Sequence, residues 1–265
     1  MSSIKTWSQE QVTIDFHQDV YENIRNQYQD VNDFSKDLKR LIAILIKNKE
    51  LYNINPYSDG VKKGIHILGK DELELRIFPN PQIAMKCSQG KPFTENLRKQ
   101  FYRTVELAED FETKLTGQQQ RLLQICPVYF HVQDAKPNSF FKQLLFMRRV
   151  SQGINLGQTN TGFDTEFRQA FDIPTLEEIR HKHQFNLHRK VDKDKKRQLL
   201  KIQTTYLFRR LLDKDIKICS LNQKNVLVDK IPETGQTRYI IIDSTEDLFP
   251  PLSPMYNIVT HQLCK

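Results

Sequence analysis

The first sixty residues carry apolar side chains at helical spacing. Two stripes are present, and within each stripe the apolar positions recur every three or four residues, which places them on one face of an α-helix. The stripe residues are Val20, Ile24 and Tyr28, followed by Phe34, Leu38, Leu41, Ile42 and Leu45. The pattern predicts two helices, the second beginning between Asp30 and Asp33, and the turn formers of residues 53–60 end the segment. Residues 1–60 are therefore expected to form a helical N-terminal extension.

Between residues 61 and 150 the apolar runs become short and alternate with turn residues, a pattern typical of β-strands. The runs are 65–68, 73–78, 83–86, 128–132 and 144–147. A longer stretch with helical periodicity, from about Glu95 to Leu123, separates the third run from the fourth. This part of the chain is expected to form one lobe, residues 61–150, with a five-stranded sheet and a helix.

Residues 151–265 favour helices again. The Gly, Ser and Asn residues of 151–157 predict a connector into this second lobe. Thr175 or the proline before it opens a helix with an acidic first turn, and a longer helix is expected over 199–212. Two short strands around the turn residues 232–235 complete the lobe. The expected fold class is α+β.

The strongest chemical signal lies in residues 218–243. A tight loop after the long helix leads to Asn225, and a β-hairpin separates Asn225 from Asp243. Amide and carboxylate oxygens suit Mg²⁺, and the protein-kinase catalytic loop, HRDxxxxN, uses its Asn and a later Asp to hold this metal. Asn and Asp also favour turn caps, which leaves a structural role open. Ser220 stands at the position of the catalytic Asp, and a serine without a helper is not a base near neutral pH.

A lysine and a glycine further upstream fit the same chemistry. The run 83–86 ends in Lys86 and resembles the kinase VAIK strand, whose Lys contacts the nucleotide phosphates and pairs with a Glu on the next helix. Among the glutamates of that helix Glu106 is the preferred partner, and the alternative for Lys86 is an ordinary edge-strand lysine. Gly69 is the candidate for the glycine-rich loop, although Asp71 replaces the usual second glycine and an ordinary hairpin turn explains the residues equally well.

Two stretches of the chain resemble a known family. Residues 220–227, with the sequence SLNQKNVL, and residues 242–252, with the sequence IDSTEDLFPPL, are similar to the YrbL-type, PhoP-regulated family of small bacterial kinase-like proteins. The similarity is close over residues 216–252 and loose over residues 64–90. It does not reach residues 1–60.

The resemblance implies a minimal protein-kinase-like two-lobed fold with ATP and magnesium as ligands. Lys86, Asn225 and Asp243 are the functional positions that it carries over to this chain. The DFG triplet of protein kinases is missing, because Ser244 and Thr245 follow Asp243. Two functions follow as alternatives: a phosphotransferase acting on an unknown acceptor, or a pseudokinase that binds nucleotide and serves as a scaffold for a protein partner.

The net charge adds a third candidate class of function, nucleic-acid binding, which the scarcity of aromatic rings then argues against. The formal net charge is +8 and the sequence pI is about 9.2, values that favour polyanionic partners. The basic stretch 180–201 is a candidate nucleic-acid surface, but Phe185 is the one ring within it, so base stacking has little support.

Cysteine spacing and hydropathy indicate the compartment. The four cysteines form no CxxC pair, which argues against a zinc site and a disulfide framework. The longest apolar run, residues 41–46, is much shorter than a membrane-spanning helix requires. The chain is therefore expected to lack a membrane span and to be cytoplasmic.

Overall fold

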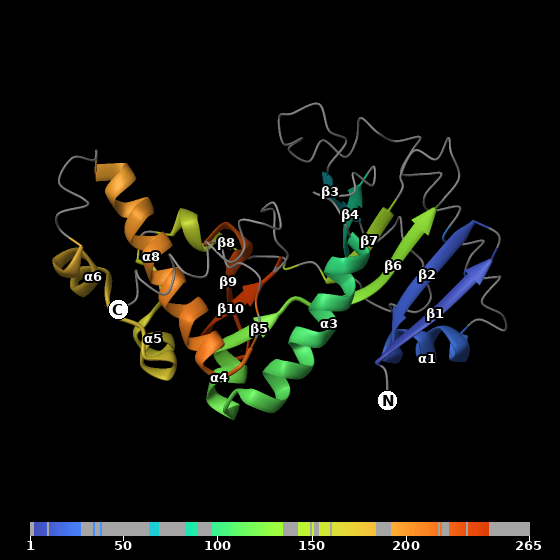
Figure 1. Cartoon of the computed structure of the whole chain (residues 1–265), viewed down its shortest axis with the longest axis horizontal. Helices are drawn as coiled ribbons and strands as arrows, with labels where there is room; N and C mark the ends of the chain where they lie inside the picture. The colour runs from blue at the N-terminus through green and yellow to red at the C-terminus, as the bar shows by residue number, and fades with distance from the viewer. Residues whose placement is uncertain are drawn as a thin grey trace. The chain divides into compact units, whose positions relative to one another are not determined.

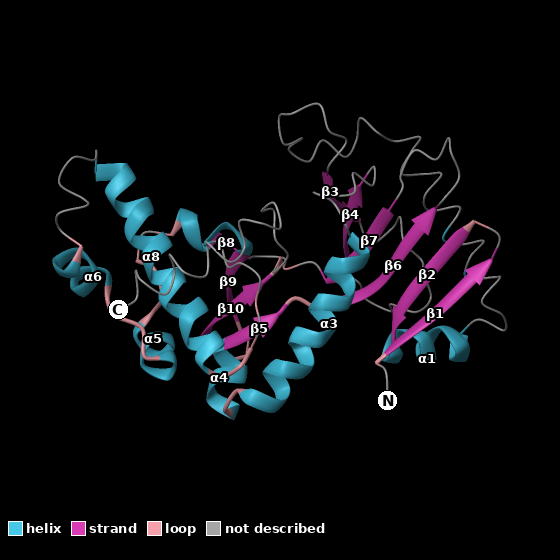
Figure 2. Ribbon diagram, in the orientation of Figure 1, coloured by secondary structure: helices cyan, strands magenta, loops and turns pink. Residues whose placement is uncertain are grey.

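The protein folds into helices and β-sheets, an α+β architecture (Figures 1 and 2). The computed structural model describes residues 3–9, 11–27, 34, 38, 64–68, 83–88, 97–134, 143–148, 150, 154–159, 161–183, 192–216, 218, 223–231 and 233–243. The chain divides into two compact units. Unit 1 comprises Met1–Val105 and Pro127–Ser151, and unit 2 comprises Glu106–Cys126 and Gln152–Lys265. This division differs from the three successive domains expected, because residues 1–60 fall within unit 1 and residues 106–126 within unit 2.

Unit 1 is built on a six-stranded sheet with the order β1-β2-β6-β7-β4-β3, and all its neighbouring strands are antiparallel. The strands are β1 (Ile4–Gln9), β2 (Val12–His17), β3 (Gly64–Leu68), β4 (Ile83–Ser88), β6 (Val128–Asp134) and β7 (Gln143–Arg148). Four of the five predicted strands are confirmed by β3, β4, β6 and β7. The remaining one, 73–78, lies outside the described residues.

The two faces of this sheet differ, because successive side chains of a strand point to opposite sides. One face is apolar: Phe16 pairs with Phe130 across β2 and β6, and Phe130 stacks on Phe146 of β7 with ring centroids 4.3 Å apart. Phe34 lies on this face, 5.6 Å from Phe130. The opposite face carries a row of polar side chains and packs against helix α3 (Leu97–Lys114) through the contacts given below.

The N-terminal segment differs from the helical extension predicted for it. Residues 4–17 form the hairpin β1–β2, and helix α1 (Gln18–Gln27) begins after it. The alternation of Val12, Ile14 and Phe16 is the strand signal, and it lies directly before the helical stripe that dominated the prediction. Residues from both predicted apolar stripes are nevertheless helical and buried: Ile24 of α1 from the first, and Phe34 and Leu38 from the second.

The helix predicted over 95–123 is interrupted. Helix α3 ends at Lys114, and a second helix, α4 (Gly117–Leu122), begins after a turn. Thr116 caps α4: its hydroxyl accepts from the Gln119 backbone N–H, and the Gln119 side chain accepts from the Thr116 N–H. This reciprocal capping box stabilises a new helix start and thereby ends the first helix.

Unit 2 contains a four-stranded sheet with the order β5-β10-β9-β8 and the remaining helices. The elements are β5 (Leu123–Ile125), β8 (Ile154–Asn155), η1 (Leu156–Gln158), α5 (Thr165–Phe171), α6 (Leu176–Lys182), α8 (Asp192–Asp213), η2 (Gln223–Asn225), β9 (Val226–Lys230) and β10 (Thr237–Ile241). Strand β5 runs parallel to β10, and the other pairs are antiparallel. The predicted helix over 199–212 is confirmed within α8, and Thr175 caps α6 as expected.

The core of unit 2 centres on an aromatic cluster. Phe167 of α5 stacks on Phe163 and on Phe171, with ring centroids 4.5 and 4.6 Å away, and its ring lies 4.3 Å from that of Tyr239 on β10. The Tyr239 hydroxyl accepts a 2.8 Å hydrogen bond from the Asp164 backbone N–H, which ties the start of α5 to the sheet. Burial raises the pKa of Tyr239, so this hydroxyl stays neutral.

Candidate functional site

The hairpin β9–β10 places Asn225 and Asp243 at the same end of two paired strands. Val226 pairs with Ile241, and the Ile242 backbone N–H donates a 2.9 Å hydrogen bond to the Asn225 carbonyl oxygen. Asp243 is the next residue after Ile242, and both Asn225 and Asp243 are half-buried. Two residues that are eighteen positions apart in sequence are thus neighbours in the fold.

The segment that carries Asn225 is anchored on both sides. Helix α8 ends at Asp213, Asp215 after it is left-handed with φ of 56°, and Ile216 and Ile218 are buried. Gln223 of η2 is buried as well and packs on η1, where a Cβ added to Gly157 would come within 3.1 Å of the Gln223 Cγ. A side chain at position 157 would therefore require the Asn155 and Gln223 side chains to shift slightly.

The oxygens of this hairpin suit a hard divalent cation. Mg²⁺ in phosphate-handling sites is held by one or two protein oxygens, and phosphate and water complete its octahedron. Asn225 and Asp243 are residues of the required kind, and their half-exposed side chains leave access for such ligands. Ser220 and Gly69, predicted to lie in the catalytic loop and the glycine loop, are outside the described residues.

Lys86 lies in β4, an interior strand of the unit 1 sheet between β7 and β3. Its Nζ donates a 3.2 Å hydrogen bond to the Gln100 Oε1 on α3, and the Gln100 side chain is 3% exposed. Glu106, the predicted partner, lies six residues further along α3 and its side chain is exposed. The Gln100 side chain therefore orients the Lys86 ammonium.

No family model matches this chain, and no curated protein sequence matches it. Within the part of the chain that the structure describes, no helix is long and apolar enough to cross a membrane.

A buried carboxylate, absent from the predicted site residues, lies in the same sheet row as Lys86. The strand registers align Thr6, Asp15, His131, Leu145 and Lys86 side by side across β1, β2, β6, β7 and β4. Because cross-strand neighbours point to the same face, these residues share the face that meets α3. In the sequence, the signal for this site is Asp15, a carboxylate between the buried residues Ile14 and Phe16 of strand β2.

Asp15 collects donors from both the sheet and the helix. Arg98 Nε and Nη2 on α3 donate to its two carboxylate oxygens at 2.9 and 3.2 Å, and the Tyr102 hydroxyl, one turn later, donates at 3.0 Å. Thr6 Oγ1 donates at 2.8 Å, and His131 Nδ1 lies 3.2 Å from Oδ2. Asp15 is fully buried, so this network fixes the N-terminal half of α3, with Gln100 in it, on the sheet.

The network sets the ionisation of its two buried members. Burial alone would raise the pKa of Asp15, but the hydrogen bonds from His131, Arg98 and Thr6 outweigh it and hold that pKa well below its usual range. Burial lowers the pKa of His131, and the opposing effect of the Asp15 carboxylate is smaller. A neutral His131 beside an ionised Asp15 is the expected state near neutral pH.

The stability of the protein is expected to fall as the pH drops below about 6.5, the ordinary pKa of histidine. The unfolded chain then binds a proton at residue 131 that the folded state resists, and stability decreases wherever the unfolded state binds more protons. His131→Asn keeps a nitrogen donor near the Nδ1 position. In this variant the free energy of unfolding should change less between pH 7 and pH 5 than it does in the wild type. This pH range spans the ordinary histidine pKa of about 6.5.

Urea denaturation at the two pH values measures this difference. His181→Asn is the matched control, because His181 lies on α6 with an exposed side chain. The same pH dependence in the wild type and in His131→Asn would contradict the assignment of a buried neutral imidazole.

Proposed function

We propose that this chain is a kinase-like protein that binds ATP with magnesium, with Lys86 at the phosphates and Asn225 and Asp243 at the metal. The observation that carries the proposal is the register of β9 and β10, in which Asn225 lies opposite Ile242 and Asp243 comes next. An amide and a carboxylate at one end of a hairpin are the oxygen pair that holds magnesium in protein kinases.

The surroundings of Lys86 support the same proposal. A lysine on an interior strand, with its ammonium hydrogen-bonded by the following helix, corresponds to the lysine that contacts the α and β phosphates in kinases. The order of the elements also agrees: strand with lysine, helix, strand pair, connector, helix, loop with Asn, and hairpin with Asp. ATP carries the negative charge that a lysine attracts.

A second candidate is a nucleotide-responsive binding module without phosphate transfer. Ser220 in place of the catalytic Asp favours it, because the loss of a general base typically costs about 10²–10⁴ in rate. Phosphoryl transfer depends mostly on positioning and charge stabilisation, so the two candidates differ in turnover and share the binding site.

Thermal unfolding with and without ATP and magnesium tests the binding. ATP at about a hundredfold over its dissociation constant should add about 2.7 kcal/mol of stability. At roughly 2–4 °C per kcal/mol, that addition is a clear rise in Tm. The magnesium-dependent part of the rise is expected to disappear in Asp243→Asn and to persist in Glu233→Gln, which changes an exposed carboxylate in the turn of the same hairpin.

An equal magnesium-dependent rise in Asp243→Asn would exclude Asp243 as a ligand, and no rise in the wild type with saturating ATP would remove the proposal. Turnover separates the two candidates. Release of phosphate from γ-labelled ATP, or labelling of the chain itself, supports a phosphotransferase if Asp243→Asn abolishes it. Binding without either reaction supports the scaffold.

A further inference from the structure

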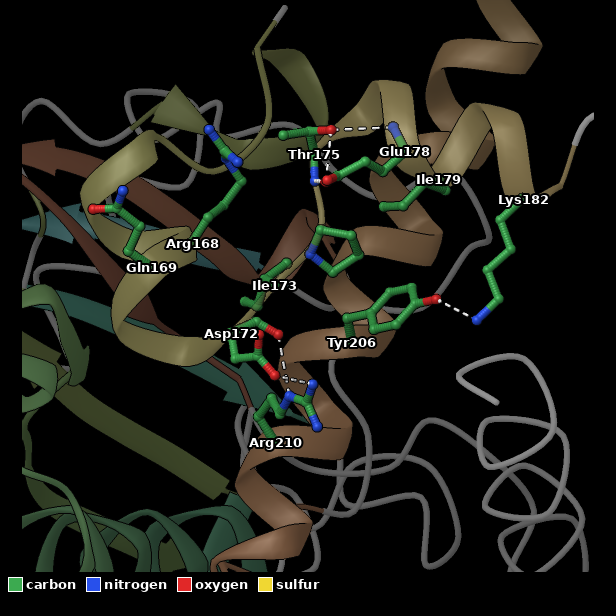
Figure 3. A pocket seen from close by; sticks show the side chains of 11 residues that line it. Arg168, Gln169, Asp172, Ile173, Thr175, Glu178, Ile179, Lys182, Tyr206 and Arg210 are labelled. Carbon is green, nitrogen blue, oxygen red and sulfur yellow. Dashed lines mark hydrogen bonds and ion pairs between the residues drawn. The ribbon is translucent and has the colours of Figure 1, made fainter.

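A pocket of about 750 Å³ opens to solvent in unit 2, where α5, α6 and α8 meet (Figure 3). Asn225 and Asp243 are not among its lining residues. The lining consists of Arg168, Gln169, Asp172, Ile173, Pro174, Thr175, Glu178, Ile179, Lys182, Tyr206 and Arg210. Its volume lies within the range of about 300–1,000 Å³ typical of ligand sites.

The two carboxylates of the lining are already engaged. Asp172 ends α5 in the left-handed conformation, with φ of 50°, and Arg210 of α8 holds it by hydrogen bonds to its carbonyl and carboxylate oxygens. Glu178 accepts from the Thr175 backbone N–H at 2.7 Å and from the Thr175 hydroxyl at 2.9 Å. These contacts fix the α5–α6 connection and partly neutralise Arg210.

Two cations of the lining have neutral partners. Arg168 donates from Nε to the Phe163 carbonyl oxygen at 3.2 Å and from Nη2 to the Thr165 hydroxyl at 3.0 Å. Lys182 lies 3.4 Å from the Tyr206 hydroxyl and 5.9 Å from the centroid of its ring. Among the described residues, neither cation forms an ion pair with a carboxylate.

Apolar surface separates these two cations. Arg168 extends from α5 on one side of the pocket and Lys182 from α6 on the other (Figure 3). The half-buried Pro174 lies on the connection between the two helices that carry these cations, next to Ile173, which is 5% exposed. The ring of Tyr206 lies on the same side of the pocket as Lys182 (Figure 3). The pocket therefore presents two positive groups with the ring of Pro174 on the connection between them.

We infer that this pocket binds an acidic peptide segment of a partner protein. Two carboxylates of the segment contact Arg168 and Lys182, and an apolar side chain between them covers the half-buried Pro174. An extended peptide fits this arrangement because the pocket is open to solvent, so that a chain can enter and leave it, whereas a small dicarboxylate would leave Pro174 uncovered. The inference is independent of the proposed nucleotide site, since it uses neither Lys86 nor the metal-site residues.

An array of short random peptides, probed with the full-length chain, tests the inference without a known partner. The wild type is expected to select peptides with two acidic residues flanking an apolar one. Arg168→Gln combined with Lys182→Gln should weaken binding of the selected peptides by about tenfold, because each exposed ion pair contributes up to about 1 kcal/mol. Binding should also weaken with added salt.

The control combines Arg180→Gln with Lys201→Gln, which removes the same charge from exposed positions of α6 and α8 outside the pocket. It should bind the selected peptides as the wild type does. Lys182→Gln alone, at an exposed side chain, keeps the test decisive if loss of the Arg168 hydrogen bonds unfolds the double variant. Selection without acidic enrichment, equal losses in control and pocket variants, or equal competition by free succinate would overturn the inference.

Discussion

Replacing Asp15 with Asn is expected to lower the free energy of unfolding by about 3 kcal/mol. Removing one partner of a buried ion pair typically costs about 3–5 kcal/mol, because the other charge loses its compensation. The lower end applies here, since the Arg98 side chain is 43% exposed and water can solvate part of its charge. Asn also loses an acceptor for the donors that converge from β1, β6 and α3.

Urea denaturation near neutral pH measures this loss, and Asp19→Asn on α1 is the control, because its side chain is 85% exposed. The loss should shrink in acid. The folded-state pKa of Asp15 is lowered, so its contribution is complete above the ordinary carboxyl pKa of about 4 and disappears as the pH falls towards the folded-state value. A loss below about 1 kcal/mol near neutral pH, the scale of an exposed pair, would show that the network does not hold α3 on the sheet.

Replacing Phe167 with Ala is expected to destabilise unit 2 by about 3–5 kcal/mol, the usual cost of deleting a buried aromatic side chain. Phe167 is fully buried and contacts three other rings, those of Phe163, Phe171 and Tyr239, so the cavity is bounded by rigid groups that cannot easily collapse into it. Chemical denaturation followed by tyrosine fluorescence measures the change.

Ile154→Ala is the matched control for Phe167→Ala, because Ile154 is an apolar residue of the same unit with 57% of its surface exposed. Its effect should stay near about 0.5 kcal/mol, as for most surface substitutions. A comparable loss in both variants would mean that the aromatic cluster adds little beyond ordinary surface packing.

Most local elements of the fold could be predicted from the sequence. The short apolar runs 128–132 and 144–147 predict strands, the stripe over 199–212 predicts a helix, and Thr175 with Glu178 three residues later predicts a helix start. The hairpin β1–β2 was missed because its alternation is short and adjoins a helical stripe. The pairing that stabilises it, with β6, lies far away in sequence and leaves no local signal.

The candidate site, like the fold, could be predicted only in part from the sequence. Asn225 and Asp243 could be related from the sequence because a short hairpin joins them. The hydrogen bond between Lys86 and Gln100 could not, because it depends on which face of α3 meets the sheet. Each helical residue turns by about 100°, so Glu106, six residues further on, lies about 120° around the helix from Gln100, which occupies the face turned to β4. Asp15 and His131, 116 residues apart, meet only in the folded sheet.

The position of β2 between β1 and β6 has a consequence for the protein during its synthesis. The hairpin β1–β2 leaves the ribosome well before β6, the strand that covers the inner edge of β2 and ends at Asp134. Until then, the backbone donors and acceptors along that edge have no native strand to pair with, and unpaired edges promote association between chains. A strand synthesised much later completes the pairing of β2, so slow translation between residues 18 and 127 should prolong the period in which nascent chains aggregate.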